Sequence, residues 1–248
     1  MNRKRFIQTS TLVAIGTQFS INSKLLSLFS YENIEIENLL GLSQSHLKSD
    51  TILLEKDTYE AFLEMKSKAL EDRIDLRIAS GYRSFKHQKA IWERKFNQLI
   101  KTHNSTKAIS EIITYSSIPG TSRHHWGTEV DLIDDYVNLP DGDLLMEENY
   151  HGNGPFSKMR SWMDENAENF GFELVYTKNK NRSGFNYEPW HYSFAPKSKS
   201  FLKLQLQENY KKAWGNLKFD GKSKLTKKFM DSYFNDYGTG INPSLMPS

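Results

Sequence analysis

The sequence predicts an α+β fold in which a small antiparallel sheet is flanked by helices. Helical patterns dominate the first part of the chain and most short strand patterns come later, without the regular strand and helix alternation of a parallel sheet. No internal repeat interrupts them. With 248 residues, of which 38% are hydrophobic and 13% aromatic, the chain is long enough to bury one core of good size. One principal domain is therefore expected.

The first elements are a helix, a strand and a second helix. Apolar residues recur at helical spacing over about residues 57–72, with charged residues between them. Residues 75–79 then alternate polar and apolar side chains, as a half-buried strand does. Gly81 marks a turn, and Ser84 is a suitable N-cap for a second helix that continues through Ile100.

The later elements are mostly short strands. A strand is expected at residues 128–132, and a third helix at 155–171, which begins with Pro and ends at Gly as helices often do. Two further short strands are expected at 172–176 and 190–194. Their number and length favour a small antiparallel sheet.

The chain is expected to divide into four segments. Residues 1–30 have the layout of an export signal, because three basic residues precede a mildly apolar run without acidic residues. The basic residues and the apolar pair after them are similar to a degenerate twin-arginine signal, and an N-terminal helix packed on the domain is the alternative. Residues 31–55 are expected to form a linker or N-terminal extension, 56–200 the main domain, and 201–248 a basic, aromatic C-terminal extension. We therefore expect an exported protein of the periplasm or cell envelope.

Composition excludes several classes of function. The 33 Lys and Arg residues are nearly balanced by 30 Asp and Glu residues, so no nucleic-acid partner is expected. No second run of about 18 apolar residues exists, which argues against an integral membrane segment beyond the signal. The chain has no cysteine, so any metal must be held by His, Asp or Glu. A monomer is expected.

Candidate metal ligands are concentrated in two segments. His124 and Asp131 are seven residues apart across Gly127, and a turn at this glycine would let both side chains converge as zinc ligands. In the second segment His191 follows Glu188 by three residues and would complete a set of three ligands. Catalytic zinc sites keep three protein ligands and leave a fourth position to water, whose pKa falls to about 7. Glu188 is then free to act as a base.

These segments, together with the Ser-Gly-Tyr-Arg-Ser turn at residues 80–84, resemble the zinc D-alanyl-D-alanine carboxypeptidase family, which includes vancomycin-resistance carboxypeptidases and LD-carboxypeptidases. The likeness extends over about residues 80–194. It depends on three motifs in the order of the family: the turn, a Ser-x-His-x-x-Gly-x-x-x-Asp segment and a Glu-Pro-Trp-His segment. One such motif alone would be weak, but three in order are specific.

The resemblance implies that residues 56–200 form a zinc peptidase domain that hydrolyses peptidoglycan stem peptides. It implies Zn²⁺ on His124, Asp131 and His191, and a general acid/base at Glu188. His125, next to the first of these ligands, is the competing candidate for that position.

Three further residues acquire roles from the resemblance. Arg83 would stabilise the polarised carbonyl or hold the substrate carboxylate, because a guanidinium stays charged and offers a planar fork. Gln88 and Ser122 would line the substrate site. Carboxypeptidase action on a C-terminal D-Ala is favoured, since Arg83 is a natural anchor for a free C-terminus. Cleavage of a cross-link by an endopeptidase stays open, as does a non-catalytic zinc-containing module that binds the cell wall.

Two features depart from the family pattern. Glu129 occupies a position where a small residue is expected, and strand alternation puts it on the same face as Asp131. It would either support a ligand histidine from behind or narrow the pocket and repel an anionic peptide terminus. Residues 138–155 form an insertion rich in Asp, Asn and Gly, which is either a loop over the cleft or a long surface excursion.

Overall fold

A computed structural model describes residues 34–48, 52–179 and 181–248. The export signal expected at residues 1–30 lies outside these ranges. The described residues belong to one unit, Asn33–Ser248. None of their helices is long and apolar enough to cross a membrane.

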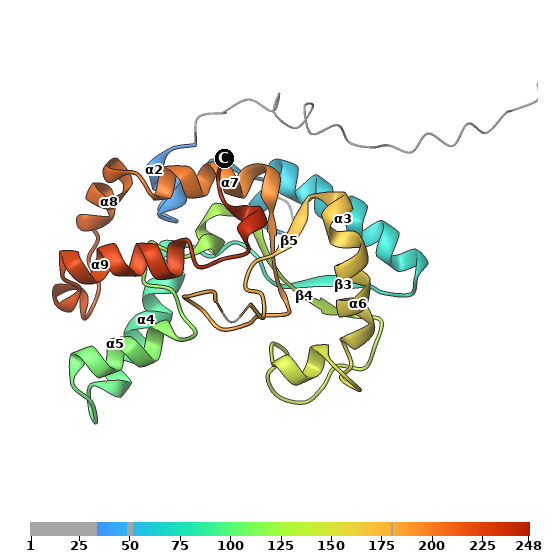
Figure 1. Cartoon of the computed structure of the whole chain (residues 1–248), viewed down its shortest axis with the longest axis horizontal. Helices are drawn as coiled ribbons and strands as arrows, with labels where there is room; N and C mark the ends of the chain where they lie inside the picture. The colour runs from blue at the N-terminus through green and yellow to red at the C-terminus, as the bar shows by residue number, and fades with distance from the viewer. Residues whose placement is uncertain (1–33, 49–51, 180) are drawn as a thin grey trace, which may run out of the picture. The chain divides into compact units, whose positions relative to one another are not determined.

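A four-stranded antiparallel sheet lies between groups of helices (Figure 1). Its strands are β3 (Leu76–Ser80), β4 (Glu129–Asp134), β5 (Phe172–Leu174) and β6 (His191–Phe194), in the order β3-β4-β6-β5. Every residue of β4 is buried, as expected of a central strand covered on both faces. A second, two-stranded sheet pairs β1 (Leu47–Lys48) with β2 (Leu54–Glu55). The predicted fold class, a small antiparallel sheet flanked by helices, is confirmed.

The three predicted helices are present, and local signals set their ends. Helix α3 (Lys56–Glu71) begins after Glu55, whose carboxylate accepts a hydrogen bond from the Thr58 backbone N–H at 2.9 Å. Helix α4 (Phe85–Leu99) begins after Ser84, the predicted N-cap. Helix α6 (Ser157–Asn166) continues as a 3-10 turn to Gly171, whose φ is 79°.

The structure contains five further α-helices within its described ranges that the periodicity of the sequence did not predict. Three of them have eight residues or fewer, which is too short for a clear helical period, and lysines lie between the apolar residues of α7. They are α2 (Ile36–Leu39), α5 (Ser105–Ile113), α7 (Ala195–Gln205), α8 (Glu208–Gly215) and α9 (Lys227–Tyr233).

The C-terminal segment, expected as an extension, packs into the same core as α4 and α5. Figure 1 shows α8 and α9 on the same side of the molecule as these helices. The Trp92 indole N–H donates to the Asp220 carbonyl at 2.8 Å, and the Trp214 indole N–H donates to the Pro119 carbonyl at 3.0 Å. The N-terminal extension also contributes to this core through Leu39, which is fully buried. Residue 200 is therefore not a boundary between compact units.

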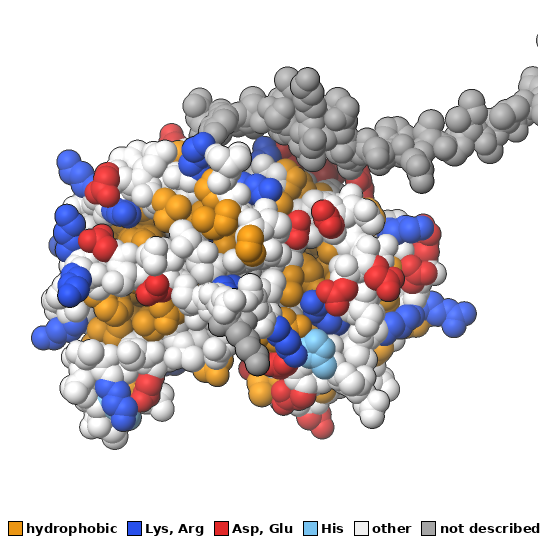
Figure 2. Space-filling model, viewed as in Figure 1, with side chains coloured by type: hydrophobic (Ala, Val, Ile, Leu, Met, Phe, Trp, Pro, Cys, Tyr) orange, Lys and Arg blue, Asp and Glu red, His pale blue; other side chains and the backbone are white. Residues whose placement is uncertain are grey.

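The basic residues of the C-terminal segment lie at the surface while its aromatic residues are buried. Figure 2 shows Lys and Arg side chains along the edge formed by α8 and α9, with Asp and Glu side chains between them. Interspersed charges of this kind are typical of a solvated face rather than of a polyanion-binding patch.

His46 makes stability depend on pH. Its Nε2 lies 3.0 Å from the Trp126 carbonyl and donates to it, and burial lowers the pKa of the imidazole to about 4. The unfolded chain takes up this proton below about pH 6.5, whereas the folded chain does not. The contribution of His46 to the free energy of unfolding is therefore fully present above about pH 6.5. It decreases as the pH falls toward 4, by up to roughly 3 kcal/mol.

Substitution His46→Gln keeps a donor but removes the titration. Urea unfolding at pH 7 and at pH 4.5 is expected to show a smaller loss of stability in this variant than in wild type. The exposed His87→Gln serves as the matched control and should behave as wild type. An unchanged pH dependence in His46→Gln would show that other groups cause it.

Candidate active site and metal centre

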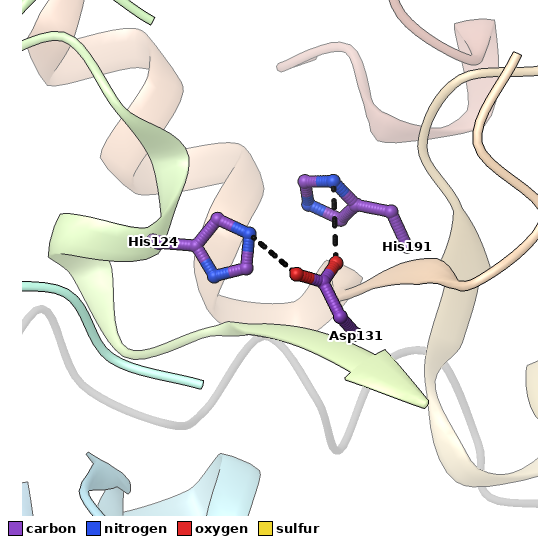
Figure 3. A group of neighbouring side chains, drawn as sticks. All are labelled: His124, Asp131 and His191. Atoms are coloured by element: carbon purple, nitrogen blue, oxygen red, sulfur yellow. Dashed lines mark ion pairs between the residues drawn. The ribbon is translucent and has the colours of Figure 1, made fainter. Parts of the chain in front are cut away.

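Three side chains from distant parts of the sequence converge on the central sheet. The His124 Nε2 atom lies 3.4 Å from Asp131 Oδ2, and the His191 Nδ1 atom lies 3.7 Å from Asp131 Oδ1. One ligand atom from each residue lies within 4.8 Å of the other two, and all three residues are buried. Figure 3 shows the two imidazole rings next to each other, each with a nitrogen directed at the carboxylate. This set of two nitrogens and one oxygen is suited to zinc.

Strand pairing and one sharp turn produce this convergence. β4 and β6 pair so that Asp131 is directly opposite His191. His124 lies in the 3-10 turn Arg123–Trp126, which ends at Gly127 with a φ of 72°. A Cβ atom at Gly127 would come within 2.5 Å of a side chain of the β1 and β2 hairpin. The turn expected at this glycine is present, and only glycine fits it.

Each histidine uses one ring nitrogen for a supporting hydrogen bond and presents the other to Asp131. His124 Nδ1 donates to the Gly81 carbonyl at 2.7 Å, and His191 Nε2 lies 3.0 Å from Glu129 Oε2. Such outer hydrogen bonds fix the tautomer and orientation of metal-binding histidines. Asp131 Oδ1 is buried without a hydrogen-bond partner among residues 34–48, 52–179 and 181–248. A cation at this point would satisfy that oxygen, so the donor set fits a metal.

Glu129 supports His191 from behind rather than narrowing the pocket. Its side chain is fully buried and pairs with the Arg123 guanidinium, whose Nη2 and Nε atoms lie 3.1 and 3.2 Å from the carboxylate oxygens. The Ser193 hydroxyl donates to the same carboxylate at 2.6 Å. Burial opposes the charge, but Arg123 and His191 hold the pKa of Glu129 at about 2. Glu129 is therefore a charged acceptor for the His191 N–H.

The electrostatic field of the cluster favours a cation. Burial raises the pKa of Asp131 to about 6, against the positive charges of His191 and Arg83. Burial opposes protonation of His191, yet Asp131, Glu129 and Glu188 raise its pKa above the ordinary value. Since Arg123 neutralises Glu129, the carboxylates of Asp131 and Glu188 are left to face a bound cation.

Glu188 lies beside the cluster at the edge of a cleft. Its Oε2 atom lies 2.9 Å from His191 Nδ1, the nitrogen that also faces Asp131, and its side chain is 17% exposed. The His191 backbone N–H donates to the Glu188 carbonyl at 3.2 Å, which fixes the spacing of the two residues. The structure thus places a partly solvated carboxylate next to the three candidate ligands.

Partly buried Arg83 and fully buried Gln88 are hydrogen-bonded to each other, and of the two only Arg83 lines the cleft. The Arg83 guanidinium donates to Gln88 Oε1 at 3.0 Å and to the Ser80 hydroxyl at 3.1 Å. Gln88 is fully buried and donates to the Ser117 carbonyl at 2.7 Å. Gln88 does not line the cleft, although the resemblance implied that it would. Its position indicates that it orients Arg83.

Ser122 lines the cleft, whereas His125 does not. Ser122 is almost fully buried and lines the cleft beside His124. His125 is fully buried outside the cleft lining, and its Nε2 accepts a hydrogen bond from the Gly120 N–H at 3.2 Å. Its other nitrogen donates to the Arg83 carbonyl. With both ring nitrogens used, His125 braces two loops, and His124 is the residue that joins the cluster.

The cluster opens into a cleft of about 760 Å³. Residues 138–155 contribute to its lining through Asp143 and through Leu145 to Glu148. The insertion is therefore a wall of the cleft and not a surface excursion. A cleft of this size is suited to a short peptide.

Sequence reasoning missed Arg123, Ser193 and Lys95 in and around this site. Arg123 and Ser193 support Glu129 from two elements, which no spacing in the sequence could indicate. Lys95 lines the cleft and lies seven residues after Gln88 on α4, so that both occupy one face of the helix. That helical spacing was the signal that could have identified Lys95.

Residues 51–197 match the model of the family VanY, described as D-alanyl-D-alanine carboxypeptidase. A D-alanyl-D-alanine carboxypeptidase of Enterococcus faecalis is 33% identical over 119 residues, which are 47% of this chain and 39% of the relative. The putative carboxypeptidase YodJ of Bacillus subtilis is 29% identical over 164 residues, which are 64% of this chain and 54% of the relative. The chain thus spans about half or less of the length of these curated relatives.

Among solved structures, VanYB in complex with D-Alanine-D-Alanine aligns with a TM-score of 0.47 and 24% identity. The alignment covers 73% of this chain and 87% of that structure.

Proposed function

Because this chain belongs to the VanY family of D-alanyl-D-alanine carboxypeptidases, we propose that it is a zinc-dependent peptidase that removes a C-terminal D-alanine from peptidoglycan stem peptides. The observation that carries the proposal is the His124, Asp131 and His191 cluster with the Glu188 carboxylate beside it. A purely structural metal site has no need of a free carboxylate next to its ligands.

Different residues of the cleft would bind the metal, transfer the proton and stabilise negative charge during hydrolysis. His124, Asp131 and His191 would hold the zinc, which would supply a Lewis acid and lower the pKa of water to about 7. Glu188 accepts a proton from the attacking water and later returns it to the leaving amine. Arg83, held by Gln88, presents a permanent positive charge to the cleft for the developing oxyanion or the substrate carboxylate.

The substrate determines where such an enzyme acts. Stem peptides are part of the cell wall, so the protein works outside the cytoplasm, in the periplasm or cell envelope. The basic and apolar layout of residues 1–30 supports export, with a twin-arginine-like signal as the proposed form.

Two other functions are distinguishable by experiment. A peptidoglycan endopeptidase would use the same metal chemistry on a bond within the peptide. A zinc-containing wall-binding module would hold the metal without hydrolysis.

The proposal is tested by metal analysis of the purified protein together with mass spectrometry of reaction products. The substrates are stem peptides that end in D-Ala-D-Ala and stem peptides that end in a single D-Ala after an L-centre. About one zinc per chain and release of free D-alanine are the expected results. Release of a larger fragment would indicate an endopeptidase, and bound zinc without any product would indicate a binding module. Absence of zinc would contradict the ligand assignment.

A further inference from the structure

Two basic side chains line the cleft without a carboxylate partner among the residues that the structure describes. The Arg83 guanidinium donates to a glutamine and a serine, and the Lys95 ammonium donates to the Ser116 hydroxyl at 2.6 Å. Within the described parts of the chain, no Asp or Glu forms an ion pair with either residue, although Asp143 and Glu148 also line the cleft. Partly buried positive charges without a counterion form a site for an anion.

The Lys95 side chain is held in place by neighbouring residues and is not free at the surface. It is half-buried on α4, and Ser116 next to it is 9% exposed. Because the Ser116 oxygen accepts from Lys95, its own O–H is left to donate to another acceptor. Lysine ammonium and serine hydroxyl together thus offer several donors at one point of the cleft wall.

Arg83 is next to the metal cluster, whereas Lys95 lies farther along α4. The Arg83 backbone N–H donates to the His124 carbonyl at 3.0 Å. Lys95 lies seven residues after Gln88, the hydrogen-bond partner of Arg83, which is about two turns or roughly 10 Å along the helix. Both side chains line the cleft. Arg83 therefore lies nearer to the cluster, and Lys95 lies farther along the cleft.

We propose that Lys95, with Ser116, binds the terminal carboxylate of the substrate peptide, which leaves Arg83 to face the scissile carbonyl. In a peptide cleaved before its last residue, the terminal carboxylate lies one residue beyond the scissile carbonyl, at a spacing of roughly 3.8 Å. Arg83 beside the cluster and Lys95 beyond it follow the same order along the cleft as these two oxygen centres. This assignment depends on the proposed function and deepens it, because it restricts the substrates to peptides with a free C-terminus.

The test compares a stem peptide that ends in D-Ala-D-Ala with the same peptide as its C-terminal amide. Wild type is expected to prefer the free carboxylate. Lys95→Met should raise KM for the carboxylate peptide about 10-fold, because a charge-assisted hydrogen bond is lost, with little change in kcat. KM for the amide should not change, and Lys95→Arg should recover most of the preference.

Lys89→Met is the matched control, since Lys89 lies on the same helix, pairs with Glu93 and does not line the cleft. It should retain the preference of wild type. An equal effect of Lys95→Met on both peptides, or no effect on either, would overturn the assignment.

Binding of the same two peptides to zinc-loaded Glu188→Gln, with and without Lys95→Met, separates this inference from the proposed function. If wild type hydrolyses no wall peptide, the proposed function fails. The inference then stands only if tighter binding of the carboxylate form still depends on Lys95. Hydrolysis by wild type together with binding that ignores Lys95 would refute the inference alone.

Discussion

Glu188→Gln is expected to lower kcat for stem-peptide hydrolysis by about 10³-fold, the typical contribution of a positioned acid/base, while the protein keeps its zinc. The amide has nearly the same shape as the carboxylate but cannot accept a proton at neutral pH. His191 loses one of its carboxylate partners but keeps Glu129 and Asp131, so the substitution leaves no buried charge unpaired. Single-turnover hydrolysis followed by metal analysis measures both quantities on one sample.

Glu165→Gln provides the control for this experiment, because Glu165 is exposed on α6 and does not line the cleft. It should hydrolyse the peptide as wild type does. Near-normal turnover in Glu188→Gln would show that another group is the base. Loss of zinc in that variant would show that Glu188 is a ligand and not a free carboxylate.

Glu129→Ala is expected to destabilise the fold and weaken zinc binding at the same time. It leaves the Arg123 guanidinium, which is 5% exposed, without its carboxylate, and a broken buried pair costs about 3–5 kcal/mol. It also removes the acceptor for His191 Nε2, and loss of such a supporting group lowers metal affinity by about 10–100-fold. Chemical denaturation without zinc measures the first effect, and competition with a fluorescent zinc chelator measures the second.

The double variant Glu129→Ala, Arg123→Met separates the two roles of this carboxylate. Methionine keeps apolar volume against Trp126, whose ring lies 4.5 Å from the guanidinium carbon, and removes the unpaired charge. Most of the stability should return while zinc binding stays weak. Recovery of zinc binding together with stability would show that Glu129 acts only through the fold.

Elements with local signals could be predicted from the sequence. The serine before α4 is a cap, and the glycine after the His124 turn adopts the positive φ expected of it. The strands that carry Asp131 and His191 follow from alternation and from the position of turns. These features depend on a few neighbouring residues, so a single sequence is sufficient to predict them.

Features that depend on distant contacts could not be predicted. The sequence pattern could not choose between the two uses of Glu129, because the choice depends on Arg123 and on a serine 64 residues away. The resemblance implied that Gln88 lines the substrate site, but its side-chain amide donates to the Ser117 carbonyl and does not reach the cleft. The many lysines after residue 200 predict an extension, because they obscure the buried positions of aromatic residues such as Tyr233.

The contacts of the C-terminal segment affect the order in which the site can form during synthesis of the chain. Tyr210 donates to the Gly120 carbonyl, Trp214 donates to Pro119, and the Tyr233 hydroxyl accepts from the Ile118 N–H at 3.2 Å. These three aromatic residues hold the segment of residues 118–120, which precedes the 3-10 turn that contains His124. During synthesis they emerge after His124, Asp131 and His191, so the nascent chain has the three candidate ligands before it has the residues that support their position. The geometry of the candidate metal site is thus expected to be complete only after the segment through Tyr233 has been made.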